Sequence, residues 1–230
     1  MKNIFISIGL FLVFQINYTY SQDYPCTCMG TKSMEKYFED KLTARIFIYS
    51  NPGSTIQFFN DWMKGDVFLT DSTVVKNKNL RYRGFGDQLI WARNSDFQTG
   101  IVDRDIVSGF VLYNKDESTY ATFKNLNIKN RNDKNNDFHY LQVLEEGDVS
   151  FYAYKRISIE KNTQEMFEDY IYYLYINEKF IPVKLKRSTL IRLLPEDKEV
   201  IRSILKNNKL STRNEKDMIK AVNLYNAYKN

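Results

Sequence analysis

The sequence predicts an α+β fold in which a curved antiparallel β-sheet, built as a meander, is followed by two C-terminal amphipathic helices. Short β-branched and aromatic runs recur along most of the chain, and Gly, Asn and Asp separate them as in consecutive hairpins. Several of these runs alternate apolar and polar side chains with the period of a strand. After Leu194 the period becomes that of a helix, and helices that follow a run of strands typically pack on one face or end of the sheet.

The strands expected in the first half of the chain are separated by polar clusters such as residues 76–79. Upstream, residues 34–42 carry apolar side chains at helical spacing, so this segment is either a short leading helix or an irregular strand. The stretch 125–137, rich in Asn, Asp and Lys, has little to bury and is expected to be an exposed loop or the tip of a long hairpin. The expected strands are residues 65–71, 80–83, 88–92, 106–113 and 120–123.

Alternation is clearest in the second half of the chain. Residues 151–160 place apolar side chains on one face and mostly polar or tyrosine side chains on the other, as in a half-buried strand. Residues 181–185 repeat the pattern, and Pro182 restricts this strand to an edge or a bulge because proline has no N–H to donate. Residues 170–176 carry apolar or aromatic side chains on both faces, which predicts a strand that is covered on both sides.

Two helices are expected at the C-terminus. Pro195, Glu196 and Asp197 give the proline-containing, acidic first turn that is typical of a helix start. Thr212 and Glu215 have the spacing of a capping box for the second helix. Apolar side chains recur at helical spacing in both segments: Val200, Ile201, Ile204 and Leu205 in the first, and Met218, Val222 and Tyr225 in the second.

The N-terminus has the three parts of a secretory signal peptide. Lys2 supplies a positive charge, residues 4–13 form an apolar run, and the small residues Thr19 and Ser21 precede a predicted cut between Ser21 and Gln22. The apolar run is shorter than the roughly 20 residues that a membrane-spanning helix needs. The alternative is a buried N-terminal helix or a membrane anchor.

Cleavage at this point divides the chain into a signal peptide, residues 1–21, and a single β-rich domain with a C-terminal helix pair, residues 22–230. The formal net charge is +5, from 33 basic and 28 acidic residues without a long block of like charge, so nucleic acid is not an expected partner. No second apolar stretch follows the first, so no transmembrane span is expected in the mature chain. The expected location is the periplasm or the cell surface.

The two cysteines, Cys26 and Cys28, are separated only by Thr27. In an oxidising compartment they either form a disulfide, which would stabilise little because the closed loop is so short, or remain free thiols. Their spacing is not the Cys-x-x-Cys of a redox helix, and Tyr24 and Pro25 do not resemble the small residues that precede a lipoprotein cysteine. Zinc would also need a ligand spacing that the chain lacks.

No catalytic, cofactor-binding or metal-binding residue is predicted. His139 is the only histidine, and the sequence has no Gly-x-Ser-x-Gly elbow, so a structural or surface role is favoured for it.

A pair of carboxylates could still cleave a glycosidic bond without histidine. Asp87, Asp103 and Asp105 lie near expected turns, beside the aromatic residues Tyr82 and Trp91. Aspartate is also common in turns for purely structural reasons, so no catalytic pair is assigned.

Five short motifs are distributed over most of the chain: Trp62-Met63-Lys64-Gly65-Asp66-Val67, Asn79-Leu80-Arg81-Tyr82, Asp87-Gln88-Leu89, Leu193-Leu194-Pro195-Glu196 and Leu224-Tyr225-Asn226. With these motifs the chain resembles a family of uncharacterised exported β-rich proteins from Bacteroidetes. The resemblance implies an envelope location and a β-rich domain, and it implies no catalytic residues.

The sequence therefore favours a non-catalytic cell-envelope protein that binds an apolar ligand or an envelope protein partner. Its export signal and aromatic strands support this expectation, since aromatic strands can line an apolar cavity. The alternative is a carboxylate-dependent hydrolase that acts on a glycan.

Overall fold

The computed structural model describes residues 44–46, 55–92, 99–128 and 138–229. Outside them lie the predicted signal peptide with its cleavage site at Ser21 and Gln22, the residues Cys26 and Cys28, the segment 34–42 and most of the polar stretch 125–137.

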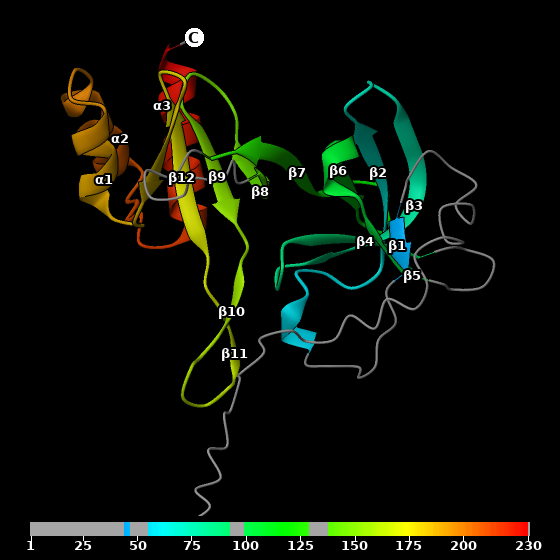
Figure 1. The fold of residues 1–230 in the computed structure, drawn as a ribbon. Coiled ribbons are helices and arrows are strands. Elements are labelled where there is room, and N and C mark those ends of the chain that lie inside the picture. Colours follow the sequence, from blue (N-terminus) through cyan, green and yellow to red (C-terminus); the bar gives the residue numbers. More distant parts are fainter. Residues whose placement is uncertain (1–43, 47–54, 93–98, 129–137, 230) are drawn as a thin grey trace, which may run out of the picture.

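Antiparallel β-structure dominates the described residues, and three α-helices follow it at the C-terminus, which confirms the α+β class (Figure 1). The strands are β1 Ala44–Ile46, β2 Met63–Leu69, β3 Val74–Arg83, β4 Gln88–Ala92, β5 Thr99–Val102, β6 Val107–Tyr113, β7 Thr119–Asn127, β8 Phe138–Glu145, β9 Ser150–Tyr154, β10 Ile157–Ile159, β11 Met166–Glu168, β12 Ile171–Ile176 and β13 Lys179–Val183. The helices are η1 Thr55–Gln57, η2 Arg104–Ile106, α1 Arg187–Leu193, α2 Lys198–Asn207 and α3 Glu215–Lys229.

Eleven of the described strands form one sheet in the order β1-β5-β4-β3-β2-β6-β7-β8-β9-β12-β13, and β10 and β11 form a separate hairpin. Most strands lie beside the strand that precedes them in the chain, as a meander requires. Three pairs of neighbours are exceptions: β1 pairs with β5, β2 pairs with β6, and β9 pairs with β12. At the other end of the sheet β13 is an edge strand, which confirms the restriction predicted from Pro182.

Two main hydrophobic cores lie at different parts of this sheet. The first core joins β2–β8 and includes the fully buried rings of Tyr82, Phe110 and Phe123. The second core packs Phe151 and Leu174 against the three helices, which lie beside β9 and β12 in Figure 1. A third, smaller cluster on β8, β9 and β12 contains Leu141, Tyr152 and Tyr154 with the half-buried Ile171, Tyr173 and Tyr175. The two faces of β12 therefore contact different clusters, as its sequence predicted.

The helical region differs from the prediction in three respects. Helix α2 begins at Lys198, so Pro195 and Glu196 precede it and Asp197 is its N-cap residue, whereas all three were expected in its first turn. Helix α1 was not expected; its Leu190 and the following Leu194 are four residues apart and both enter the second core. The residue that caps α3 is Asn214, whose Oδ1 accepts a hydrogen bond from the N–H of Asp217 at 2.8 Å. The predicted capping box of Thr212 and Glu215 is therefore wrong, because the backbone of Thr212 has a positive φ of 52° and the helix begins only at Glu215.

Strand β3 is longer than predicted, because the polar cluster 76–79 lies within it. These residues are polar because much of this part of the strand is exposed, and the left-handed Asn77 accompanies an irregular register between β2 and β3. The start of the polar stretch 125–137 likewise belongs to β7, while the expected strand 151–160 is interrupted between β9 and β10.

Candidate functional site

A polar groove lies between β2, β3 and the hairpin of β6 and β7. Its volume is about 970 Å³, which is at the upper end of the range of about 300–1,000 Å³ for small-molecule pockets. The lining combines three aromatic side chains with Asn, Asp, Glu and Lys. The aromatic members are Trp62, Tyr113 and Tyr120.

The alternation of β2 separates the groove from the first core. Gly65 and Val67 are buried on the core side of the strand, whereas Lys64 and Asp66 contribute to the groove on the other side. Gly65 has no substitute here, because a Cβ atom would lie 2.2 Å from the carbonyl oxygen of Val111 in β6. This close approach of the two strands brings the start of β2 and the end of β6 to the same groove.

Two of the groove's aromatic rings are well exposed: Trp62 at 40 % and Tyr120 at 45 %. Arg81 lies beside Trp62, with its guanidinium carbon 6.0 Å from the centre of the indole ring and 3.7 Å from the centre of the Phe58 ring. The same side chain donates a hydrogen bond from Nε to the backbone oxygen of Asn60 at 3.0 Å. Arg81 therefore fixes the surroundings of an indole ring that remains accessible.

Asp66 is held at both carboxylate oxygens. Oδ1 accepts a hydrogen bond from the backbone N–H of Asn77 at 2.8 Å, and Oδ2 accepts one from the hydroxyl of Tyr113 at 3.1 Å. Partial burial, followed by this hydrogen bond and the charge of Asp66, raises the pKa of Tyr113, so the hydroxyl stays protonated and acts as the donor. Strands β2, β3 and β6 thus share one fixed carboxylate in the groove.

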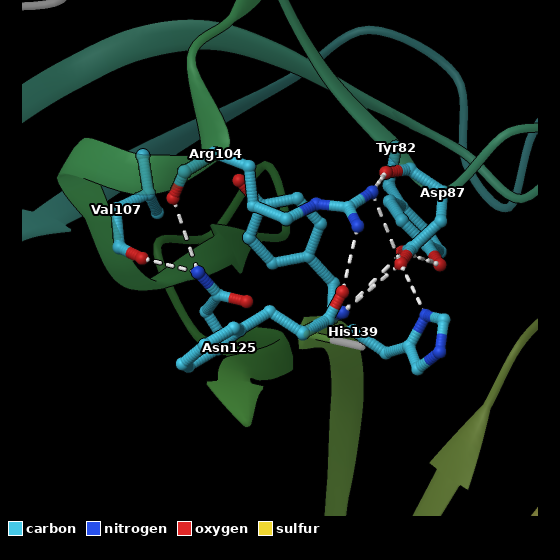
Figure 2. A network of polar contacts seen from close by, with 8 residues as sticks. Tyr82, Asp87, Arg104, Val107, Asn125 and His139 are labelled. Atoms are coloured by element: carbon cyan, nitrogen blue, oxygen red, sulfur yellow. Dashed lines mark hydrogen bonds and ion pairs between the residues drawn. The ribbon is translucent and has the colours of Figure 1, made fainter. Parts of the chain in front are cut away.

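A second polar site is the network around the buried side chain of Asp87, shown in Figure 2. Asp87 follows Gly86 in the turn between β3 and β4, and both residues have left-handed backbones, with φ values of 53° and 83°. Its Oδ1 accepts a hydrogen bond from the hydroxyl of Tyr82 at 2.8 Å. Its Oδ2 lies 3.0 Å from Nδ1 of His139 and 3.2 Å from Nη2 of Arg104.

The network also completes the hydrogen bonding of β8. Strand β9 pairs with β8 only as far as Ala153, which lies opposite Gln142, and the backbone N–H of Tyr140 donates to the Asp87 carboxylate at 3.3 Å instead. Burial, followed by the charge of Asp87, raises the pKa of Tyr82 well above its usual value and keeps its hydroxyl a donor. Asp87 thereby links the turn after β3 to η2 and β8, which is a structural role.

His139, the second residue of β8, is one of the partners of Asp87 on that strand. Its ring stacks on Tyr154 with centroids 4.6 Å apart, and about a quarter of its side chain is exposed. A pairing between histidine and carboxylate orients the ring, as in sites of general base catalysis, but here the pair also joins strands that are distant in sequence.

The carboxylates considered from the sequence do not meet as a pair. Asp103 caps η2 by accepting a hydrogen bond from the N–H of Asp105 at 3.2 Å, and Trp91 is buried in the first core. The side chain of Asp87 instead contacts the hydroxyl of Tyr82. None of these residues lines the groove, whose own acidic residues are Asp61, Asp66 and Glu117.

No group of three or more His, Cys, Asp or Glu side chains in the part of the chain that the structure describes could hold a metal ion. The helices of that part include none that is both long and apolar enough to cross a membrane.

No protein-family model matches the chain, and no curated protein or solved structure is significantly similar to it. The resemblance to exported Bacteroidetes proteins therefore stays a prediction.

Proposed function

We propose that this chain is an exported, non-catalytic cell-envelope protein and that it acts by binding a ligand in the groove between β2, β3 and the β6–β7 hairpin. The observation that carries the proposal is the exposed aromatic pair Trp62 and Tyr120 inside a polar groove of about 970 Å³. The predicted signal peptide, residues 1–21, supports a location in the periplasm or at the cell surface.

The groove is a better candidate than an apolar cavity among the helices. The space between Val149 and helices α1, α2 and α3 is lined by apolar side chains, but it has no room for a water molecule. An apolar ligand would have to displace this packing, whereas the groove is already open.

Irregular strand pairing supports the predicted curvature of the sheet around the groove. The register shifts between Gly65 and Val67 in β2, and again between Leu112 and Tyr113 in β6. Such bulges bend a strand and increase its twist. A sheet that curves at these two places would hollow the face that carries the groove.

The proposal is tested by purifying the processed protein from its native envelope and recording native mass spectra. We expect an N-terminus at Gln22 and a bound species that is lost when Trp62 and Tyr120 are both changed to alanine. A species that persists in this double variant would overturn the assignment of the groove. A bound lipid that persists would instead favour the apolar-ligand hypothesis.

A second candidate function is hydrolysis of a glycan, because Asp61, Asp66 and Glu117 all line the groove. Asp61 forms an ion pair with Arg81 at 3.3 Å, and Asp66 is held at both oxygens, so Glu117 would be the proton donor. Release of new reducing ends from a glycan that is abolished by both Asp66→Asn and Glu117→Gln would establish this activity.

A further inference from the structure

We infer that the groove binds a neutral glycan chain, one of whose sugar rings stacks on Trp62. This inference rests on the proposed function, because it names the chemical class of the ligand in the same groove. It is independent of whether the glycan is cleaved.

The strands beneath the groove are interior strands, which argues against a peptide ligand. Strand β2 pairs with β3 on one side and β6 on the other, and β3 also pairs with β4. A peptide that binds by strand addition needs the free N–H and C=O groups of a sheet edge. Here those groups are used within the sheet, so the groove recognises its ligand through side chains.

The side chains that remain fit a sugar. Aromatic rings have a negative face, which attracts the slightly positive C–H groups on the face of a pyranose. Amide groups can donate and accept hydrogen bonds at the hydroxyls of the sugar, and carboxylates can accept them. The groove supplies both kinds of group: exposed rings at Trp62 and Tyr120, and polar side chains at Asn114, Asp66 and Glu117.

The positive and negative side chains in and beside the groove are equal in number. Lys64 and Lys115 match Asp66 and Glu117 in number, and Asp61 is paired with Arg81. A site for a polyanion such as a nucleic acid or a strongly acidic polysaccharide would present an excess of positive charge. A ligand without net charge is therefore the better match.

The two tryptophans of the chain provide a direct readout. Trp62 is 40 % exposed in the groove, whereas Trp91 is 4 % exposed in the first core. Acrylamide should therefore quench mainly Trp62, with Trp91 as the internal reference. The full chain, as processed by its host, would be titrated with neutral tetra- to hexasaccharides from glucan, xylan and chitin, with acidic oligogalacturonates and with unstructured peptides.

We expect a neutral oligosaccharide to protect Trp62 from quenching and to bind with measurable heat in calorimetry. Trp62→Ala should weaken that binding roughly tenfold or more, and Trp62→Phe should retain most of it, because phenylalanine preserves a stacking face. The matched control is Tyr228→Ala, which removes an aromatic ring of 59 % exposure on α3, outside the groove lining, and should leave the affinity unchanged.

Protection of Trp62 by a peptide or an acidic sugar, and by no neutral one, would overturn the glycan inference and leave the groove as the binding site. Sugar binding that is unaffected in a folded Trp62→Ala protein would overturn both proposals. If Trp62→Ala does not fold, the quenching experiment on the unaltered protein decides alone, and failure of every neutral oligosaccharide to protect Trp62 overturns the glycan inference.

Discussion

Asn226, near the end of α3, holds the backbone of Val149 at both of its polar groups. Its Oδ1 accepts a hydrogen bond from the Val149 N–H at 3.0 Å, and its Nδ2 donates to the Val149 carbonyl oxygen at 2.9 Å. The amide also packs on Gly147, where a Cβ atom would lie 2.4 Å from Nδ2. The last helix is therefore fixed to the turn between β8 and β9 by a side chain that is only 5 % exposed.

Asn226→Ala should destabilise the protein by about 2 kcal/mol or more, because it leaves a buried N–H and a buried carbonyl without a partner. The free energy of unfolding from urea denaturation measures the loss. Asn223→Ala is the control, since Asn223 lies on the exposed side of the same helix and donates an exposed hydrogen bond to the Glu145 carboxylate. A similar loss in both variants would show that the helix surface, not the link to Val149, determines the effect.

Lys155 is a buried lysine whose Nζ lies 2.5 Å from the Glu215 carboxylate and 4.4 Å from the ring centre of Tyr170. Glu215→Gln should cost about 2 kcal/mol of stability, because it leaves a buried cation without its counter-charge, although partial exposure of Glu215 moderates the loss. Lys155→Met should cost less, since it removes the charge together with its desolvation penalty. Thermal and urea unfolding would rank the two variants.

The matched control for this pair is the exposed ion pair of Lys124 and Glu146. Glu146→Gln should change the unfolding free energy by no more than about 0.5 kcal/mol, as is typical of surface pairs. Equal effects at Glu146 and Glu215 would contradict the argument from burial.

Asp87→Asn should lower the unfolding free energy by about 2–3 kcal/mol. Asparagine can still accept one hydrogen bond from Tyr82 or Tyr140, but it has no charge to balance Arg104. Asp105→Asn, at an exposed position of η2, should have an effect within about 0.5 kcal/mol. Equilibrium urea unfolding of the two variants makes the comparison, and a stable Asp87→Asn protein would mean that the network contributes little.

Asp197 and Tyr225 should make the free energy of unfolding depend on pH, Asp197 in acid and Tyr225 in alkali. Hydrogen bonds from Lys229 and Tyr225 lower the pKa of Asp197, so its contribution is present above about pH 4 and is lost as the pH falls through the folded-state pKa. Burial, followed by the bond to Asp197, raises the pKa of Tyr225 to about 12. The contribution of Tyr225 is therefore present below about pH 10 and is lost as the pH rises toward 12.

Unfolding free energies measured across pH would test both signs. Asp197→Asn should reduce the loss of stability in acid, and Tyr225→Phe should reduce the loss in alkali. Tyr228→Phe, at the exposed residue three positions further along α3, should change neither the loss in acid nor the loss in alkali. If Tyr225→Phe loses as much stability at alkaline pH as the unaltered protein, ionisation of Tyr225 is not the cause of that loss.

Local patterns predicted much of the fold. Pro182 restricted its strand to an edge or a bulge, and β13 is an edge strand. The period-two pattern from Phe151 placed β9, and the apolar stripe of Ile201 and Leu205 placed α2 against the core. The patterns failed where tertiary structure overrides local preference. Residues 76–79 look like a loop because they are polar, but Lys78 and Asn79 pair with β2 and the segment lies within β3.

The candidate site was much less predictable. Its aromatic rings come from positions as distant as Trp62 and Tyr120, and they meet only because β6 lies beside β2. The sequence did place Asp87 beside Tyr82, yet it gave no signal for His139, 52 residues away, whose contact with Asp87 depends on the same sheet order. Side chains brought together by strand order leave no spacing pattern in the chain.

The pairing of β2 with β6 also has a consequence for how the molecule assembles. Gly65 pairs with Leu112, which is far away in the sequence, whereas each strand from β6 to β9 pairs with the next strand along the chain. Closing long loops is entropically harder and slower than joining adjacent strands. The groove is therefore expected to be among the last features to form, so that the proposed ligand could bind only when folding is complete.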